Sequence, residues 1–263
     1  MEDQIILIDK PAHISSFGVV AKVRAKLRDE FGHKVKVGHT GTLDPFATGL
    51  LILLSGKMTK RSNEFLKLDK VYEATLKLGY VSSTGDPEGE ITEVIISKHG
   101  ETFPKEKSSD SPDFYNISPL KNSASEASIK NFSEAEHVVK INPREYYPSL
   151  EIITSVISTF VGTITQTPPR FSAIKVGGQR AYKLARQGKD FEIPSREITI
   201  YSIEIMDYDY PELKIRVHCS SGTYIRTLAE DIGKALGTGA YLTALRRTRI
   251  GDYVINDATQ LET

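Results

Sequence analysis

Gly38-His39-Thr40-Gly41-Thr42-Leu43-Asp44-Pro45-Phe46-Ala47-Thr48-Gly49-Leu50 is the most informative stretch of this chain. Its three glycines allow backbone conformations that other residues rarely adopt, and they let the backbone approach a ligand closely. Pro45 fixes a turn and favours an extended conformation at Asp44. The stretch therefore predicts a carboxylate held at a defined angle on a tight loop, next to a histidine.

Two common phosphate-binding loops do not fit this stretch. No Lys-Ser or Lys-Thr pair follows the glycines, as a Walker loop requires, and the glycine spacing differs from that of a dinucleotide fingerprint. An aspartate before a proline is usually a turn former. Spacing alone therefore does not reveal a reaction.

The elements around the loop predict an α+β fold. Residues 4–9 and 70–79 have the pattern of strands, and a helix is expected from Ser15 or Ser16 to about Phe31. In 70–79 the apolar alternation shows one irregularity, near Tyr72.

Later elements add a helix over 149–160, strands over 198–206 and 212–218, and a helix over 223–236 that ends at Gly237. Strands and helices do not alternate regularly, so we expect one domain, residues 1–263, with a mixed, mostly antiparallel sheet flanked by helices. Residues 97–148 are rich in Ser, Lys, Glu, Asn and Pro and predict a partly disordered insertion.

Composition is that of a folded protein, with 39% hydrophobic and 26% charged residues. The one cysteine, Cys219, excludes an internal disulfide and favours a reducing compartment. No secretory signal begins the chain and the longest apolar run is too short for a bilayer, so a cytoplasmic protein without membrane contact is expected. The histidines are scattered and no Cys-x-x-Cys pair exists, so no metal is expected.

The charge is balanced overall, with 34 basic and 34 acidic residues, but it is not evenly distributed. Residues 165–196, called here the basic segment, contain seven basic and two acidic side chains, a net charge of +5, with aromatic residues among them. A second cluster comprises Arg246, Arg247 and Arg249. Such clusters are either solvated faces or RNA-binding surfaces.

The quoted stretch resembles the active-site motif of the TruB family of tRNA pseudouridine synthases, close to GHxGTLDPxAxGxL, at every fixed position. Other family motifs are similar to segments along the chain: Lys10-Pro11 with Ser15-Ser16, Val71-Tyr72-Glu73-Ala74, residues 83–89, residues 166–186, Cys219 to Arg226, and Leu245-Arg246-Arg247-Thr248. One departure is His13, which stands where the family usually has glycine.

The resemblance implies roles for several residues. Asp44 would be the catalytic aspartate, acting as a nucleophile or as the stabiliser of a ribosyl cation. Arg226 would pair with Asp44, and Tyr72 would lie beside the target base, although a strand tyrosine in the core is the alternative.

His39 would help to displace the flipped uridine, with an acid/base role or a purely structural role as alternatives. Lys10 and Thr42 are expected to complete the substrate site. The expected RNA-binding residues are Arg170, Lys175, Arg180, Tyr182, Arg186, Arg246 and Arg247.

The implied fold is the pseudouridine synthase catalytic fold with an RNA-gripping thumb, here the basic segment. The implied activity is isomerisation of uridine to pseudouridine at position 55, in the T-loop of tRNA, by a monomer that needs no cofactor. Because the chain ends shortly after Gly251, no C-terminal PUA domain is expected. A guide-RNA-dependent synthase subunit and a non-catalytic tRNA-binding or folding protein remain alternatives.

Overall fold

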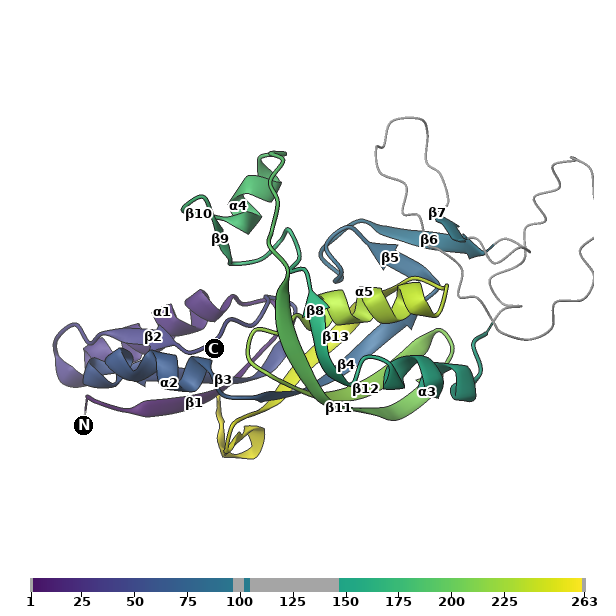
Figure 1. Ribbon diagram of the computed structural model, residues 1–263. Helices are drawn as coiled ribbons and strands as arrows, with labels where there is room; N and C mark the ends of the chain where they lie inside the picture. The colour runs from purple at the N-terminus through teal and green to yellow at the C-terminus, as the bar shows by residue number, and fades with distance from the viewer. Residues whose placement is uncertain (1, 97–101, 105–146, 262–263) are drawn as a thin grey trace, which may run out of the picture.

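The computed structural model describes residues 2–96, 102–104 and 147–261 (Figure 1). Most of the segment 97–148, expected to be an insertion, lies outside these residues. The helices are α1 (Ser16–Phe31), α2 (Ser62–Leu66), α3 (Leu150–Ser158), α4 (Ala181–Arg186) and α5 (Ile225–Ala235), with short 3-10 turns η1 (Gly56–Arg61) and η3 (Ile255–Asp257). None of the helices in the described ranges is long and apolar enough to cross a membrane.

A mixed sheet of ten strands in the described residues forms the body of the molecule. Its strands are β1 (Ile5–Lys10), β2 (Val37–His39), β3 (Thr48–Ser55), β4 (Lys70–Leu78), β8 (Gly162–Gln166), β11 (Arg196–Asp209), β12 (Glu212–Cys219), β13 (Ala240–Ile250), β14 (Tyr253–Val254) and β15 (Thr259–Gln260). The main order is β15-β1-β3-β13-β4-β12-β11-β8. Only the β1–β15 and β3–β13 pairs are parallel, which confirms the predicted mixed, mostly antiparallel α+β fold.

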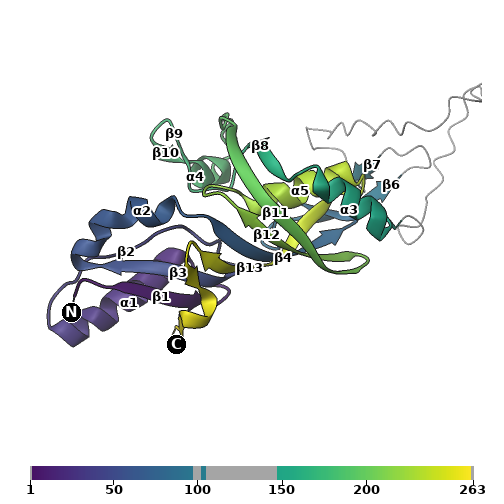
Figure 2. The ribbon, with the colours of Figure 1, turned by 60° about the horizontal axis from the view of Figure 1, so that its bottom comes forward.

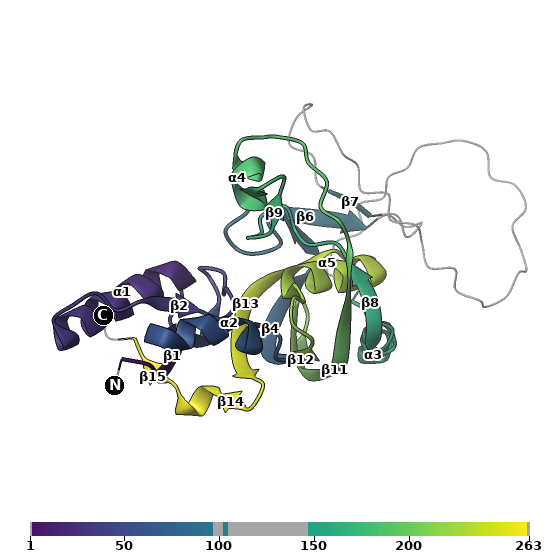
Figure 3. The same cartoon turned by 60° about the vertical axis from the view of Figure 1, so that its left-hand side comes forward.

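In the part of the chain that the structure describes, two small sheets lie outside the main one. Strands β5 (Tyr80–Ser82), β6 (Ile91–Ile96) and β7 (Thr102–Pro104) form one of them. The other is the hairpin β9 (Lys175–Val176) with β10 (Gln179–Arg180). In Figures 1 and 3 this hairpin and α4 stand away from the main sheet, so the basic segment has the projecting form of a thumb.

Helix α1 begins and ends at residues that the sequence marks. Ser15 accepts a hydrogen bond from the Gly18 N–H, which satisfies one of the free donors of the first turn, and Gly32 ends the helix in the left-handed region. Val19, Val20, Val23 and Leu27 face the sheet. Figure 2 shows α1 against β1 and β3, as the apolar positions predict.

Strand β3 is buried on both faces, which explains its uninterrupted apolar run. Leu51 and Leu53 pack with α1, whereas Leu50, Ile52 and Leu54 belong to a separate cluster with Phe65 and Ile250. The largest core cluster lies further along the sheet, where α3 and α5 cover β4, β11 and β12. The strand that follows the glycine-rich loop is therefore fixed from two sides.

Two features differ from the sequence-based expectation. The irregularity near Tyr72 is absent, because burial alternates through β4 without a break and Tyr72 shares the buried face with Ala74 and Leu76. The long strand β13 was not predicted, although it lies between β3 and β4 in the middle of the sheet. Helix α5 ends as expected, with Gly237 at φ 69° directly after its C-cap.

Candidate active site

The loop between β2 and β3 presents Asp44 and is held by a buried serine at the start of α1. Ser16 Oγ donates a hydrogen bond to the Leu43 carbonyl (2.9 Å) and accepts one from the Leu43 N–H (2.8 Å). One hydroxyl thus satisfies both backbone groups of the residue before Asp44. Asp44 itself closes a turn, because its carbonyl accepts from the Ala47 N–H at 3.2 Å.

Arg247 holds the same loop from β13. Its Nε donates to the Leu50 carbonyl (2.8 Å) and its guanidinium NH2 donates to the Gly41 carbonyl (3.1 Å). Gly49 permits this close approach, because a Cβ there would lie 2.3 Å from the Arg247 carbonyl oxygen. Arg247 is only 1% exposed, so the structure places it in the wall of the site and not on an open surface, and its contact with RNA stays a prediction.

Lys10 supports the loop from β1. Its side chain is fully buried, and Nζ donates to the carbonyls of Pro11 (2.8 Å), Ile14 (2.8 Å) and Pro45 (3.1 Å). Burial lowers the pKa of Lys10 to about 8, although the nearby Asp44 acts in the opposite direction. With all three donors engaged by the protein, Lys10 has the geometry of a loop support and not that of the expected substrate contact.

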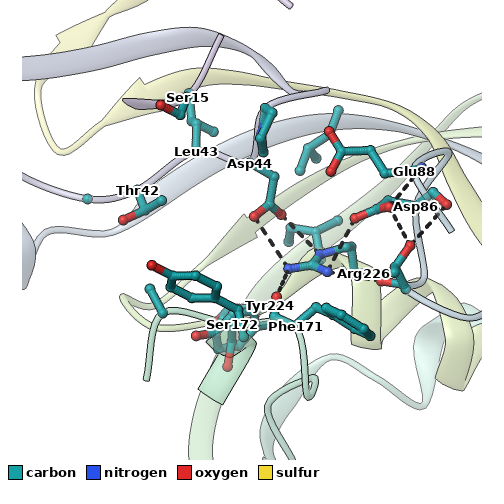
Figure 4. Close-up of a pocket in the computed structure, with 18 of the residues that line it drawn as sticks. Ser15, Thr42, Leu43, Asp44, Asp86, Glu88, Phe171, Ser172, Tyr224 and Arg226 are labelled. Carbon is teal, nitrogen blue, oxygen red and sulfur yellow. Dashed lines mark hydrogen bonds and ion pairs between the residues drawn. The ribbon is translucent and has the colours of Figure 1, made fainter. Parts of the chain in front are cut away.

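Arg226, the second residue of α5, lies between two carboxylates (Figure 4). Its Nε is 3.0 Å from Asp44 Oδ2, and its NH1 is 3.2 Å from Asp86 Oδ2. The guanidinium also donates to the carbonyls of Thr84 and Phe171, each at 2.9 Å. The Arg226 side chain is 3% exposed and that of Asp44 is 32% exposed, so a buried cation orients a carboxylate that solvent can still reach.

Burial raises the pKa of the Asp44 carboxyl above its ordinary value. Arg226 lowers it, Asp86 raises it, and Lys10 lowers it to a smaller extent. The same environment raises the pKa of Glu88, first through burial and then through Asp86 and Asp44. Arg226 is therefore the main group that opposes protonation of Asp44, and Asp86 is the main charged neighbour that favours it.

A cavity of about 800 Å³ opens above Asp44. Thr42, Tyr72, Tyr182 and Arg186, all predicted site residues, line it together with Asp44, Arg226 and Arg247. Tyr72 is almost fully buried, and burial raises its pKa. The structure thus joins the loop, β4, the basic segment and α5 around one space. Its volume lies in the range of small-ligand sites, about 300–1,000 Å³.

His39 lies at the end of β2 and is half-buried, but it is not one of the residues that line the cavity. Its Nδ1 accepts a weak hydrogen bond from the Gly41 N–H at 3.4 Å. Burial lowers its pKa, and Arg247 and Arg180 act in the same direction, so the neutral ring is favoured. Its role in displacing the uridine stays a prediction.

The remaining predicted RNA-binding residues are mostly exposed on the basic segment. Arg170 donates to the Lys189 carbonyl and lies over the Phe191 ring at 4.9 Å, whereas Arg180 donates to the Ala173 carbonyl. Lys175 is exposed on β9.

Arg246 differs from this group. It forms a two-pronged ion pair with Asp9 on β1, with distances of 3.0 and 2.8 Å, and its side chain is 40% exposed. Arg246 therefore links β13 to β1 across the sheet, and a contact between Arg246 and RNA would compete with this ion pair.

Sequence reasoning missed several residues of the site. Asp86 and Glu88 lie within the family-like segment 83–89, whose spacing was noticed without a role for either carboxylate. Lys70 lines the cavity, and its Nζ donates to the carbonyls of Leu66 and Leu68 while burial lowers its pKa to about 8. Within the described residues, no group of His, Cys, Asp and Glu side chains is placed to hold a metal ion.

The fold has known counterparts among solved structures. A chain of a Cbf5–Nop10–Gar1 complex superposes with a TM-score of 0.57 at 23% identity, covering 99% of this chain and 52% of that one. A chain of an H/ACA RNP bound to a substrate RNA containing 2'-deoxyuridine gives a TM-score of 0.55 at 22% identity, with 98% and 51% covered. The chain spans about half the length of those chains, and the likeness establishes a shared fold.

Sequence comparison then identifies the family to which the chain belongs. Residues 28–111 and 120–225 match the TruB family pseudouridylate synthase N-terminal domain, and residues 226–263 match the tRNA pseudouridylate synthase B C-terminal domain. The chain is 40% identical over 262 residues to tRNA pseudouridine synthase B of Phocaeicola vulgatus, covering 99% of this chain and 91% of the relative. The enzyme of the same name from Parabacteroides distasonis is 41% identical over 254 residues, with 96% and 88% covered. The chain therefore belongs to the TruB family of pseudouridylate synthases, which are isomerases.

These matches bear on two expectations about organisation. Residues 226–263 match the family's own C-terminal domain rather than a PUA domain, which confirms that expectation for this part of the chain. In the structure they provide α5 and β13, so they are integral to the main sheet. The N-terminal match extends into 97–148 and omits 112–119 between its two parts, and the insertion stays a prediction.

Proposed function

We propose that this protein converts uridine to pseudouridine at position 55, in the T-loop of tRNA, with Asp44 as the catalytic residue. The observation that supports this most directly is the Asp44–Arg226 pair, 3.0 Å apart beside a cavity of about 800 Å³. The buried Arg226 favours the ionised form of the carboxylate and orients it beside the cavity where a nucleotide would enter. A protein that only binds RNA has no use for a carboxylate facing phosphates.

The reaction is an isomerisation. The bond between N1 of uracil and C1′ of the ribose breaks, the base turns, and C5 bonds to C1′. The proton at C5 is lost and N1 gains one, so no atom is added overall. A carboxylate suits either role open to Asp44, covalent attack or stabilisation of a ribosyl cation.

The target must leave its stack to reach the cavity. Tyr72 offers a flat ring on the cavity wall, and the neutral, half-buried His39 has the size and shape to replace a base. The exposed cations of the basic segment would neutralise phosphates of the T-arm stem-loop. Recognition would then depend on the folded shape of the RNA more than on base edges.

The test is site-resolved pseudouridine mapping on an unmodified tRNA transcript, with no other RNA or protein added. Wild type should produce one pseudouridine in the T-loop, and Asp44→Asn should produce none while binding the RNA with near-normal affinity. Asp29→Asn, at an exposed carboxylate on α1, is the matched control and should stay active. Turnover by Asp44→Asn would overturn the catalytic assignment, and activity only with an added guide RNA would favour the guide-dependent alternative.

A further inference from the structure

One buried hydroxyl in the cavity wall has no partner among the residues that the structure describes. Ser172 is 4% exposed, and its Oγ makes no hydrogen bond with residues 2–96, 102–104 or 147–261. A buried polar group is unfavourable unless it is paired, and such groups in folded proteins nearly always find a partner. Because Ser172 lines the cavity that also holds Asp44 (Figure 4), a bound substrate can supply that partner.

The backbone around Ser172 is fixed by hydrogen bonds to the rest of the site. Its carbonyl accepts from the Tyr182 N–H at 3.0 Å, and the preceding carbonyl, that of Phe171, accepts from Arg226 at 2.9 Å. Arg226 in turn pairs with Asp44. The backbone that carries this hydroxyl is therefore held at a set position relative to Asp44, as the support of a ligand-binding group must be.

The other polar groups of the cavity indicate what kind of atom Ser172 meets. Tyr182 and Arg186 line the cavity from the basic segment, and Arg196, which also lines it, lies over the Tyr224 ring at 5.0 Å. Arginines and serine hydroxyls are the groups that proteins commonly direct at phosphate and ribose oxygens. A base, in contrast, needs a flat apolar surface, which Tyr72 provides.

We propose that Ser172 Oγ donates a hydrogen bond to the 2′-hydroxyl or to the 5′ phosphate of the target nucleotide, and so positions that nucleotide over Asp44. This inference rests on the proposed function, because it takes a flipped uridine to be the occupant of the cavity. Thr227 gives a useful contrast. Its Oγ1 is also buried and unpaired within the described residues, but it does not line the cavity.

The first experiment compares Ser172→Ala with Thr227→Val, each of which removes one buried hydroxyl without a partner in the described structure. Ser172→Ala should lower kcat/KM on an unmodified T-arm RNA by about tenfold, the effect of one lost hydrogen bond. Thr227→Val should leave kcat/KM unchanged. Both variants should keep the wild-type melting temperature, because neither loses a bond within the described protein. Wild-type activity in Ser172→Ala would overturn the proposal.

Two chemically altered RNAs distinguish the possible oxygens. One has a 2′-deoxyribose at the target uridine, and the other has a phosphorothioate at its 5′ phosphate. The RNA that lacks the contacted oxygen should reduce wild type to the level of Ser172→Ala and abolish the difference between the two proteins. If the tenfold difference persists on both RNAs, Ser172 does not contact either backbone oxygen and the proposal fails.

Failure of the proposed function can be recognised separately. RNA affinity is measured in the Asp44→Asn background with and without Ser172→Ala, where turnover plays no part. Weaker binding caused by Ser172→Ala would support the contact even if wild type modified another RNA, whereas equal affinity and equal kcat/KM would refute it. If Ser172→Ala does not fold, Ser172→Cys keeps the size of the side chain with a much weaker donor and gives the same comparison.

Discussion

Replacing Ser16 with alanine tests whether the position of Asp44 depends on a hydroxyl outside the chemical step. Ser16 is 2% exposed, and its Oγ bonds both the carbonyl and the N–H of Leu43. Alanine would leave these two backbone groups without partners in a buried place. Since each unpaired group costs about 1–2 kcal/mol, the free energy of unfolding should fall by about 2–4 kcal/mol.

The same change should reduce the chemical rate more than RNA binding. Leu43 precedes Asp44, so the carboxylate would lose part of the support that aims it. A misplacement of about 1 Å can cost roughly 100-fold in rate, and we expect a fall of about 10- to 100-fold in the single-turnover rate constant. RNA affinity should stay close to wild type, because the basic segment is untouched. Denaturant titration and rapid-quench kinetics measure the two effects.

Ser149→Ala is the control for loss of stability alone. Ser149 caps α3, where its Oγ accepts from the Ile152 N–H at 3.4 Å. Its loss should cost about 1 kcal/mol without changing the rate constant. If Ser16→Ala kept the wild-type unfolding free energy to within about 0.5 kcal/mol, or kept the wild-type rate constant, the serine would not be holding the loop.

Other consequences can be measured on the same enzyme. Burial raises the pKa of Asp44, so the single-turnover rate should fall as the pH drops through a value above the ordinary aspartate pKa; a rate that stays level down to about pH 4 would contradict this. Asp86→Asn should slow the reaction, because Arg226 loses a charged partner, and should move that acid limb to lower pH, because a negative neighbour of Asp44 is gone; an unmoved limb would argue against the coupling. His13 has φ 64°, a region that favours glycine, so His13→Gly should raise the free energy of unfolding by about 0.5–1 kcal/mol in denaturant titrations, and no gain would mean that the histidine is not strained there. Lys175→Ala should weaken RNA binding and reduce the slope of log K against log salt by about 1. Lys214→Ala, on β12, removes a cation that is paired with Asp207 of β11 and should leave that slope unchanged.

The sequence predicts best those features that depend on neighbouring residues. Ser15 caps α1 as expected, and Gly237 follows the end of α5 in the left-handed region. The motif around Asp44 predicted the family, which the comparisons confirm. The family-like segment from Cys219 to Arg226 predicted the pairing of Arg226 with Asp44, which the structure shows. Capping and turn formation are local, so a few residues contain the information that they need.

Burial of charge could not be predicted in the same way. Arg247 and Lys10 were assigned to RNA and to substrate from family-like motifs and, for Arg247, from a basic cluster, and neither shows whether a cation is buried. Their partners are backbone carbonyls distant in sequence, such as that of Leu50 for Arg247 and that of Pro45 for Lys10. Strand β13 was not predicted because its arginines are unusual in a central strand. Their burial depends on the strands on either side, which the local sequence does not show.

The strand order has a consequence for how the protein is made. Strand β13 lies between β3 and β4, which are synthesised much earlier, and α5 brings Arg226 to a loop from the first quarter of the chain. During translation the Asp44 carboxylate therefore exists without Arg226, and the place of β13 between β3 and β4 stays empty until this last long strand leaves the ribosome. Contacts between such distant residues slow folding. The protein should acquire its activity in one late step, and a nascent chain that lacks β13 should be inactive even with every residue of the glycine-rich loop in place.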